Sequence, residues 1–123
     1  MKIIACELQS AHPLLSAFEA GGPVPTPRAA GFVSGVGYGS VLPEMWPLLK
    51  SLVDAVITVT LDQVAQAIRY LVEHNRVVAE GAGAVSVAAA LWGGHGHSRM
   101  CAVVSGGNID RAMLETILAG RTP

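Results

Sequence analysis

Residues 101–110 read CAVVSGGNID, an apolar run followed at once by a hydroxyl, two glycines, an amide and an acid. The run is rich in β-branched residues and predicts a buried strand. Ligands of open parallel sheets bind beyond the carboxyl ends of the strands, so Ser105 and Asn108 lie where ligand contacts are expected. Gly106 and Gly107 have no side chain and let a ligand approach the backbone closely. A plainer interpretation stays open, in which Ser105 and Asn108 only cap the helix that follows.

A second polar group, Glu80, directly precedes a Gly-Ala-Gly sequence at the start of an Ala-rich segment that predicts a helix. A carboxylate at this position favours the positive end of the helix, so capping is one role for Glu80. His95 and His97 have no Cys or Asp partner nearby and are interpreted as part of a solvated loop. Cys6 and Cys101 both lie in apolar runs, so we expect two small buried side chains and no disulfide.

Hydrophobic periodicity predicts the framework that must position these residues. Three strands are expected, at 2–7, 54–60 and 100–107, and four helices, at 12–21, 61–78, 79–94 and 108–120. Residues 41–53 have a helix pattern that Pro47 interrupts. The strand at 54–60 is continuously apolar, which predicts burial on both faces. Strands separated by helices indicate parallel pairing, so the expected fold class is α/β, three-layer, with a mostly parallel sheet flanked by helices. Residues 1–123 predict a single partial α/β domain, with 21–40 as a long Gly/Pro-rich loop.

Composition excludes some classes of partner. The net charge of −1 provides no basic field for nucleic acid. No run approaches the roughly 18 apolar residues of a membrane span, and the first residues lack the basic region of a signal peptide, so neither a membrane nor secretion is expected. The predicted location is cytoplasmic. The chain is 51% hydrophobic, which is high for 123 residues, so some apolar surface is expected to contact another chain, for example in a homo-oligomer.

Three ordered blocks, DAVITVTLDQVAQAI, VVAEGAGAVSVAAAL and VVSGGNID, resemble the C-terminal half of a known enzyme family. The family is that of the pyridoxal-phosphate-dependent threonine and serine dehydratases and serine racemases, which have the tryptophan-synthase-β fold type, fold type II. The resemblance begins at KIIACE and extends over essentially the whole chain. It implies that the chain is part of the large domain of such an enzyme, and that the family's cofactor is pyridoxal phosphate.

The resemblance also implies roles for particular residues. Ser105 takes the position of the serine that hydrogen-bonds the pyridine nitrogen, and Glu80 that of the glutamate near the ring. Gly35, in FVSGVGYG, takes the position of a glycine that borders the ring, and Ser34 stands where many members have aspartate. The expected cofactor-binding residues are therefore Ser105, Gly106, Gly107, Asn108, Glu80 and Gly35.

A divalent-cation site seen in some relatives has two matching positions here, Glu7 and Ala11. Pro13 stands where the third ligand, an acid, is expected. A single carboxylate is a poor oxygen cage for Mg²⁺ or Ca²⁺, so no metal is expected.

Two parts of the family's machinery have no counterpart in this sequence. These are the lysine that forms the Schiff base and the Gly-rich loop that holds the phosphate. Lys2 and Lys50, the only lysines, match no family position. No catalytic residue is therefore predicted in this chain, and ring contacts alone are too few for tight cofactor binding.

Three interpretations of function remain open. The chain is a truncated or partial relative of a dehydratase that is inactive alone, or one subunit of a split dehydratase completed by an N-terminal-half chain. The third interpretation is a repurposed homo-oligomeric interaction module. A completed site would be expected to eliminate water from a β-hydroxy amino acid and give an oxo acid and ammonia.

Overall fold

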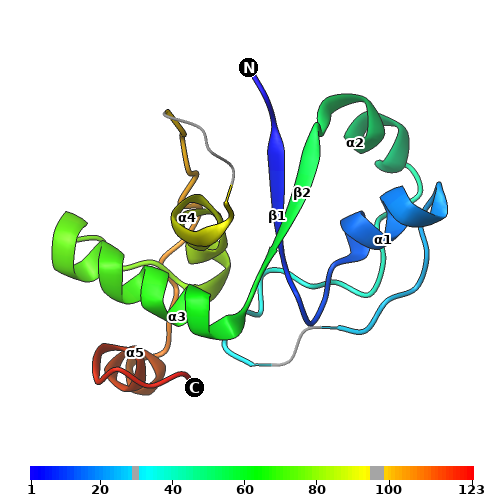
Figure 1. Cartoon of the computed structure of the whole chain (residues 1–123). Coiled ribbons are helices and arrows are strands. Elements are labelled where there is room, and N and C mark those ends of the chain that lie inside the picture. The colour runs from blue at the N-terminus through cyan, green and yellow to red at the C-terminus, as the bar shows by residue number, and fades with distance from the viewer. Residues whose placement is uncertain (29–30, 95–98) are drawn as a thin grey trace.

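The structure is a computed structural model that describes residues 1–28, 31–94 and 99–123 (Figure 1). Its elements, in chain order, are β1 (Ile4–Leu8), α1 (Pro13–Ala20), α2 (Trp46–Leu52), β2 (Ala55–Val59), α3 (Leu61–Tyr70), the π-helical turn η1 (Leu71–Asn75), α4 (Gly81–Trp92) and α5 (Arg111–Leu118). Residues 21–28 and 31–40 contain neither helix nor strand.

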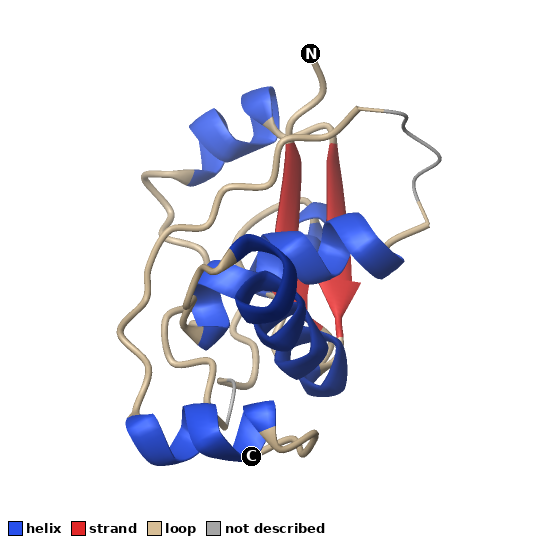
Figure 2. Ribbon diagram, turned by 90° about the vertical axis from the view of Figure 1, so that its left-hand side faces the viewer, coloured by secondary structure: helices blue, strands red, loops and turns tan. Residues whose placement is uncertain are grey.

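Strands β1 and β2 pair in parallel, from Ile4 opposite Ala55 to Leu8 opposite Val59. Side chains alternate between the two faces of a strand, and both faces are covered by helices. Cys6 and Leu8 point into the core formed with α3 and α4, whereas Ala5 packs toward α1 and α2. Figure 2 views the molecule from the side of α3 and α4, which lie in front of the strands. The fold is therefore α/β, with a parallel sheet between two layers of helices, as the sequence predicted.

The predicted third strand is wrong. Residues 100–107 form no strand, and the described part of the chain has a two-stranded sheet. Cys101 is exposed rather than buried, and the Val103 side chain is 71% exposed. A β-branched run becomes a strand only where a neighbouring strand supplies hydrogen-bond partners, and none of the described residues does so here. The strand at 100–107 was therefore predicted from local sequence preference, although a strand also needs a neighbouring strand to pair with.

Two smaller expectations are also corrected. In β2, Ile57 and Val59 are buried, but Val56 and Thr58 are only half-buried, because α1 and α2 cover their face of the sheet incompletely. Cys6 is half-buried, and burial raises the pKa of its thiol. Both cysteines are free thiols.

Helix α3 follows directly from its sequence. The Thr60 hydroxyl accepts a hydrogen bond from the Gln63 backbone N–H at 3.1 Å, and the Thr60 N–H donates to Gln63 Oε1 at 2.9 Å. This reciprocal pair is a capping box, which satisfies two amides at the helix start. Val64, Ala65 and Ile68 form the buried stripe that packs on the core. The helical region ends earlier than the predicted position 78, because η1 closes at Asn75 and Arg76 turns to a φ of 59°.

Glu7 connects β1 to α1. Its Oε1 accepts a hydrogen bond from the Leu14 N–H at 2.8 Å, and its Oε2 accepts one from the Leu15 N–H at 3.0 Å. Both oxygens of this carboxylate therefore satisfy amides that the first turn of a helix leaves without partners. The residue that the family resemblance places at a cation site has a structural role in this chain.

Replacing Glu7 with alanine is expected to lower the free energy of unfolding by about 1–3 kcal/mol, since two charge-assisted hydrogen bonds to helix amides are lost. Glu19→Ala is the matched control, because Glu19 is an exposed carboxylate on the same helix. Urea unfolding of Glu7→Ala and Glu19→Ala measures the difference between their free energies of unfolding. Equal stabilities of the two variants would contradict the assigned role.

Candidate functional site

The site predicted from the sequence is assembled from three segments that meet in space: the loop at 31–35, the start of α4, and residues 105–108. The Glu80 N–H donates a hydrogen bond to the Gly106 carbonyl at 3.0 Å, which joins the second segment to the third. A Cβ atom at Gly35 would lie 2.6 Å from the Ala82 Cβ, which brings the first segment against α4. The three segments therefore form one contact network.

Glycines make these approaches possible. A Cβ atom at Gly83 would lie 2.7 Å from the Gly106 carbonyl oxygen, and one at Gly81 would lie 2.6 Å from the Phe32 carbonyl oxygen. At Gly107 the added atom would lie 2.8 Å from the Val78 carbonyl oxygen. Real Cβ atoms do not come this close to backbone, so glycine is required by chain packing at these positions. This requirement is additional to the space for a ligand that the sequence suggested.

Glu80 immediately precedes α4, but its carboxylate caps none of the first-turn amides of that helix, Gly81 to Ala84. The carboxylate instead lies against Gly106, and a Cβ atom at that position would require the Glu80 side chain to move. Glu80 is half-buried. The Glu80 side chain therefore does not cap α4 by a hydrogen bond, and its assignment to the cofactor ring stays a prediction.

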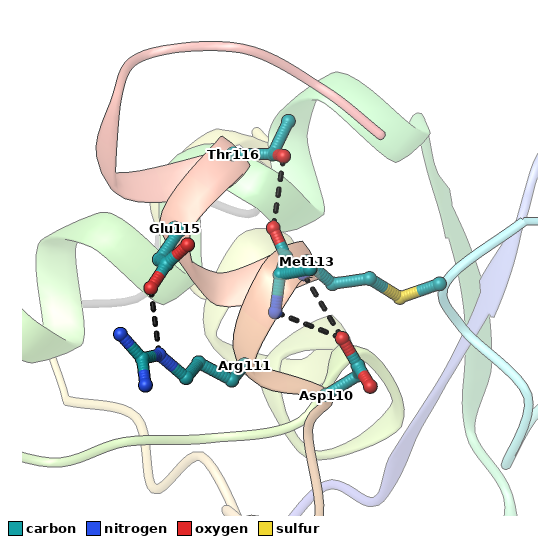
Figure 3. Close-up of polar contacts among 6 residues, drawn as sticks. Asp110, Arg111, Met113, Glu115 and Thr116 are labelled. Carbon is teal, nitrogen blue, oxygen red and sulfur yellow. Dashed lines mark hydrogen bonds and ion pairs between the residues drawn. The ribbon is translucent and has the colours of Figure 1, made fainter.

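The interpretation of Ser105 and Asn108 as helix caps is wrong, because α5 is capped by Asp110 (Figure 3). Asp110 Oδ1 accepts hydrogen bonds from the backbone N–H groups of Ala112 and Met113, at 2.8 and 3.4 Å. The helix consequently begins at Arg111, three residues later than predicted. The sequence contained a signal for this cap, since an aspartate directly before a helical pattern is a preferred N-cap.

A cavity of about 200 Å³ lies where the three segments meet. Gly35, Glu80 and Asn108 line it, so it includes three of the six predicted site residues. Asp110 and Ser34 also line it, and the sequence had not proposed either of them as a ligand contact. The residues around this cavity carry carboxylate, amide and hydroxyl groups.

The other three predicted residues lie close by but do not line the cavity. Gly106 contacts both Glu80 and Gly83, and Ser105 is exposed directly before it. Gly107 is also exposed. The surface that carries the predicted ring contacts is therefore open to solvent in this chain.

Neither lysine lies at this site. Lys50 is on α2, across the sheet from α4, with its Nζ 5.9 Å from the centre of the Trp46 ring. Lys2 borders a different cavity, next to β1. Among the described residues that line the 200 Å³ cavity there is no lysine or arginine. The described residues that line this cavity therefore offer neither an amine for covalent attachment of pyridoxal phosphate nor a cation for its phosphate.

The described helices include none that is both long and apolar enough to cross a membrane. Within the same residues, no three His, Cys, Asp or Glu side chains lie close enough together to hold a metal ion. His95 and His97 lie outside the described residues.

Known proteins resemble this chain both in sequence and in fold. It is 34% identical over 114 residues to the biosynthetic L-threonine dehydratase of Salmonella typhimurium, a match that covers 89% of this chain and 22% of that protein. It is 46% identical over 72 residues to the L-threonine ammonia-lyase of Thermotoga maritima, covering 58% of this chain and 18% of that protein. The structure of processed threonine deaminase isoform 2 from Solanum lycopersicum matches with a TM-score of 0.86 and 26% identity, covering 98% of this chain and 35% of that one.

The chain thus spans about a fifth of the length of these two curated relatives. It is a partial relative of the threonine dehydratases, and its fold is that of the large domain of fold type II enzymes. The family model of the pyridoxal-phosphate dependent enzymes matches residues 1–106, which contain every predicted site residue except Gly107 and Asn108. This chain therefore belongs to the family of pyridoxal-phosphate dependent enzymes.

Proposed function

We propose that this chain is the ring-facing part of a pyridoxal-phosphate-dependent threonine or serine ammonia-lyase. It is inactive by itself, and it acts when another polypeptide segment supplies the lysine and the phosphate-binding loop. The proposal includes a cytoplasmic location, which the two free thiols support.

One observation carries this proposal. Glycines without room for a Cβ atom bring the three segments with the predicted ring contacts together, yet the cavity between them has no lysine or arginine among its described lining residues. Backbone packing that depends on several glycines is a specific arrangement, and the family match supports its relation to the cofactor. The absent amine and cation are the two groups that a complementary segment would have to provide.

Bound pyridoxal phosphate would supply an electron sink for elimination of water from a β-hydroxy amino acid, with hydrolysis then giving a 2-oxo acid and ammonia. In the proposed complex, the Ser105 hydroxyl donates a hydrogen bond to the pyridine nitrogen. A hydroxyl leaves that nitrogen unprotonated, which favours prompt elimination over longer-lived carbanion chemistry. Gly106, Gly107 and Asn108 border the ring, together with Gly35 and Glu80.

The test is complementation in trans. The partner polypeptide is the part of the Salmonella typhimurium dehydratase that precedes the segment matched by this chain. With pyridoxal phosphate and L-threonine or L-serine, the chain alone is expected to form no oxo acid and to show no absorbance band of a lysine-bound cofactor. The mixture is expected to form both oxo acid and ammonia. Oxo acid from the chain alone would refute the proposed dependence on a partner.

Ser105→Ala is expected to lower kcat of the complemented enzyme by up to about tenfold, the equivalent of one lost hydrogen bond. Ser51→Ala is the matched control, because Ser51 is on α2 and bonds only the Leu48 carbonyl at 2.8 Å among the described residues. The cofactor absorbance of the complex gives a second readout, which should change with Ser105→Ala only. Identical spectra and rates for both variants would remove Ser105 from the site.

A homo-oligomeric interaction module is the second candidate. It is favoured by exposed apolar side chains at helical spacing on α2 and its N-cap, namely Met45, Leu48 and Leu52. A large exposed apolar surface usually marks an interface. Sedimentation of the chain alone separates the candidates: a stable oligomer that is unchanged by the partner polypeptide would favour the module.

A further inference from the structure

One side of the 200 Å³ cavity is formed by residues 108–110, together with Met113 of α5. Two contacts locate this segment. The Gly106 carbonyl, before it, accepts the hydrogen bond from the Glu80 N–H. At its end, Asp110 Oδ1 accepts hydrogen bonds from the first amides of α5 (Figure 3). The position of α5 therefore helps to set the position of this side of the cavity.

Helix α5 is attached to the core at its C-terminal end. Ile117, in the last turn, is buried in the core cluster that also contains Ile68 of α3. Leu114, one turn earlier, is half-buried and packs against the same cluster. Residues 111–113, at the start of the helix, are exposed. Burial thus holds α5 at one end, whereas its other end borders the cavity.

Arg69 of α3 is bonded to the attached end of α5. Its Nη1 donates a hydrogen bond to the Ile117 carbonyl at 3.2 Å, and the residue is half-buried. The same carbonyl accepts a hydrogen bond from the Gly120 N–H at 3.0 Å, where the chain turns with a φ of 85°. Carbonyl groups in the last turn of a helix lack partners within the helix and carry partial negative charge, so a cation is favourable there. Arg69 therefore ties the end of α5 to a helix of the core.

We propose that Arg69 is a positioning residue for the cavity. It does not line the cavity itself. By holding the end of α5, it keeps Asn108 and Asp110 in place at the start of that helix. A helix of eight residues is a rod about 12 Å long, so a displacement of its end is transmitted to its start. The relevance of this role to the cofactor rests on the proposed function.

Amide hydrogen exchange of the chain alone, followed by NMR, tests the transmission along α5. Arg69→Met keeps an unbranched apolar side chain but removes the charge and the donors. Exchange of the Ile109, Ala112 and Met113 amides is expected to become about threefold to tenfold faster, the equivalent of one lost hydrogen bond. Faster exchange at residues 119–121 alone would mean that only the helix end frays, and it would overturn the proposal. A uniform rise that includes α4 would indicate general destabilisation and would also overturn it.

Two further variants isolate the hydrogen bond of Arg69. Arg121→Met is the matched control, because Arg121 also lies at the end of α5 but is exposed, and its side chain makes no hydrogen bond within the described residues. It should change the same exchange rates by less than about twofold. Arg69→Lys retains a positive charge with N–H donors and should restore most of the protection. If Arg121→Met had as large an effect as Arg69→Met, the bond to Ile117 would not be the cause.

A cofactor measurement distinguishes positioning from a merely structural role. In the mixture with the Salmonella polypeptide described above, Arg69→Met is expected to raise the Kd for pyridoxal phosphate about threefold or more, at a temperature where the variant stays folded. Loss of stability alone would lower the amplitude of the cofactor absorbance band and leave this Kd unchanged. Glu7→Ala provides that comparison, since it weakens the attachment of α1 and leaves α5 intact.

The outcomes separate this inference from the proposed function. If the exchange rates at the start of α5 rise but the mixture forms no oxo acid, Arg69 positions the segment and the proposed function is rejected. If the mixture is active and Arg69→Met matches the unsubstituted chain in exchange and in Kd, the inference is overturned and the proposed function stands. Faster exchange with an unchanged Kd would overturn the role of Arg69 toward the cofactor.

Discussion

Gly83→Ala is expected to lower the free energy of unfolding by about 2 kcal/mol and to separate α4 from the Ser-Gly-Gly-Asn segment. A Cβ atom at this position would lie 2.7 Å from the Gly106 carbonyl oxygen and 3.1 Å from the Gly106 nitrogen. Both neighbours are backbone atoms, so relief requires one segment to move. Movement would also disturb the hydrogen bond from the Glu80 N–H to the same carbonyl.

The direction of the stability change in Gly83→Ala distinguishes the contact with Gly106 from the effect of helix propensity. Gly83 lies inside a helix, where alanine is intrinsically better than glycine by about 1 kcal/mol, so helix propensity alone predicts stabilisation. The matched control is Gly22→Ala, because a Cβ atom at Gly22 has no described neighbour within 4 Å. Chemical denaturation measures the free energy of unfolding of Gly83→Ala and of Gly22→Ala. A more stable Gly83→Ala protein would mean that α4 and Gly106 are not in close contact.

Ile68→Ala is expected to cost about 2–5 kcal/mol, the range for truncating a fully buried aliphatic side chain. Ile68 is 0% exposed and belongs to the core cluster that joins α3 to β1, β2, α4 and α5. The cavity left behind would have walls on several elements, so local collapse cannot fill it. Loss of this contact should loosen α5, whose Ile117 is equally buried.

Ile3→Ala makes the same chemical change at a residue that is 41% exposed, just before β1. Its backbone N–H bond to Asp54 Oδ2, at 2.7 Å, does not depend on the side chain. This control should change stability by about 0.5 kcal/mol or less. The midpoint temperatures of thermal unfolding of Ile68→Ala and Ile3→Ala should therefore differ widely. Similar transition midpoints would show that α3 does not anchor the core.

The sequence by itself determined the elements whose stability is local or whose pattern is strong. The helix that forms α3 was predicted from hydrophobic periodicity, because its apolar stripe lies within one segment of the chain. The first two strands, their parallel pairing and the α/β class followed from apolar runs separated by helices. Family membership was predicted from three ordered blocks, and the family match confirms it. The assignment of the six site residues to the cofactor stays a prediction.

Only the tertiary structure decided the features that depend on partners distant in sequence. The run at 100–104 has the composition of a strand, but hydrogen-bond pairing is a property of two segments, and the described chain provides no second one. The roles of Glu7 as a support for α1 and of Gly83 as a contact for Gly106 likewise arise from close approach between separate elements. Periodicity reports which face of a segment is apolar, whereas contact between segments is fixed by how the whole chain packs.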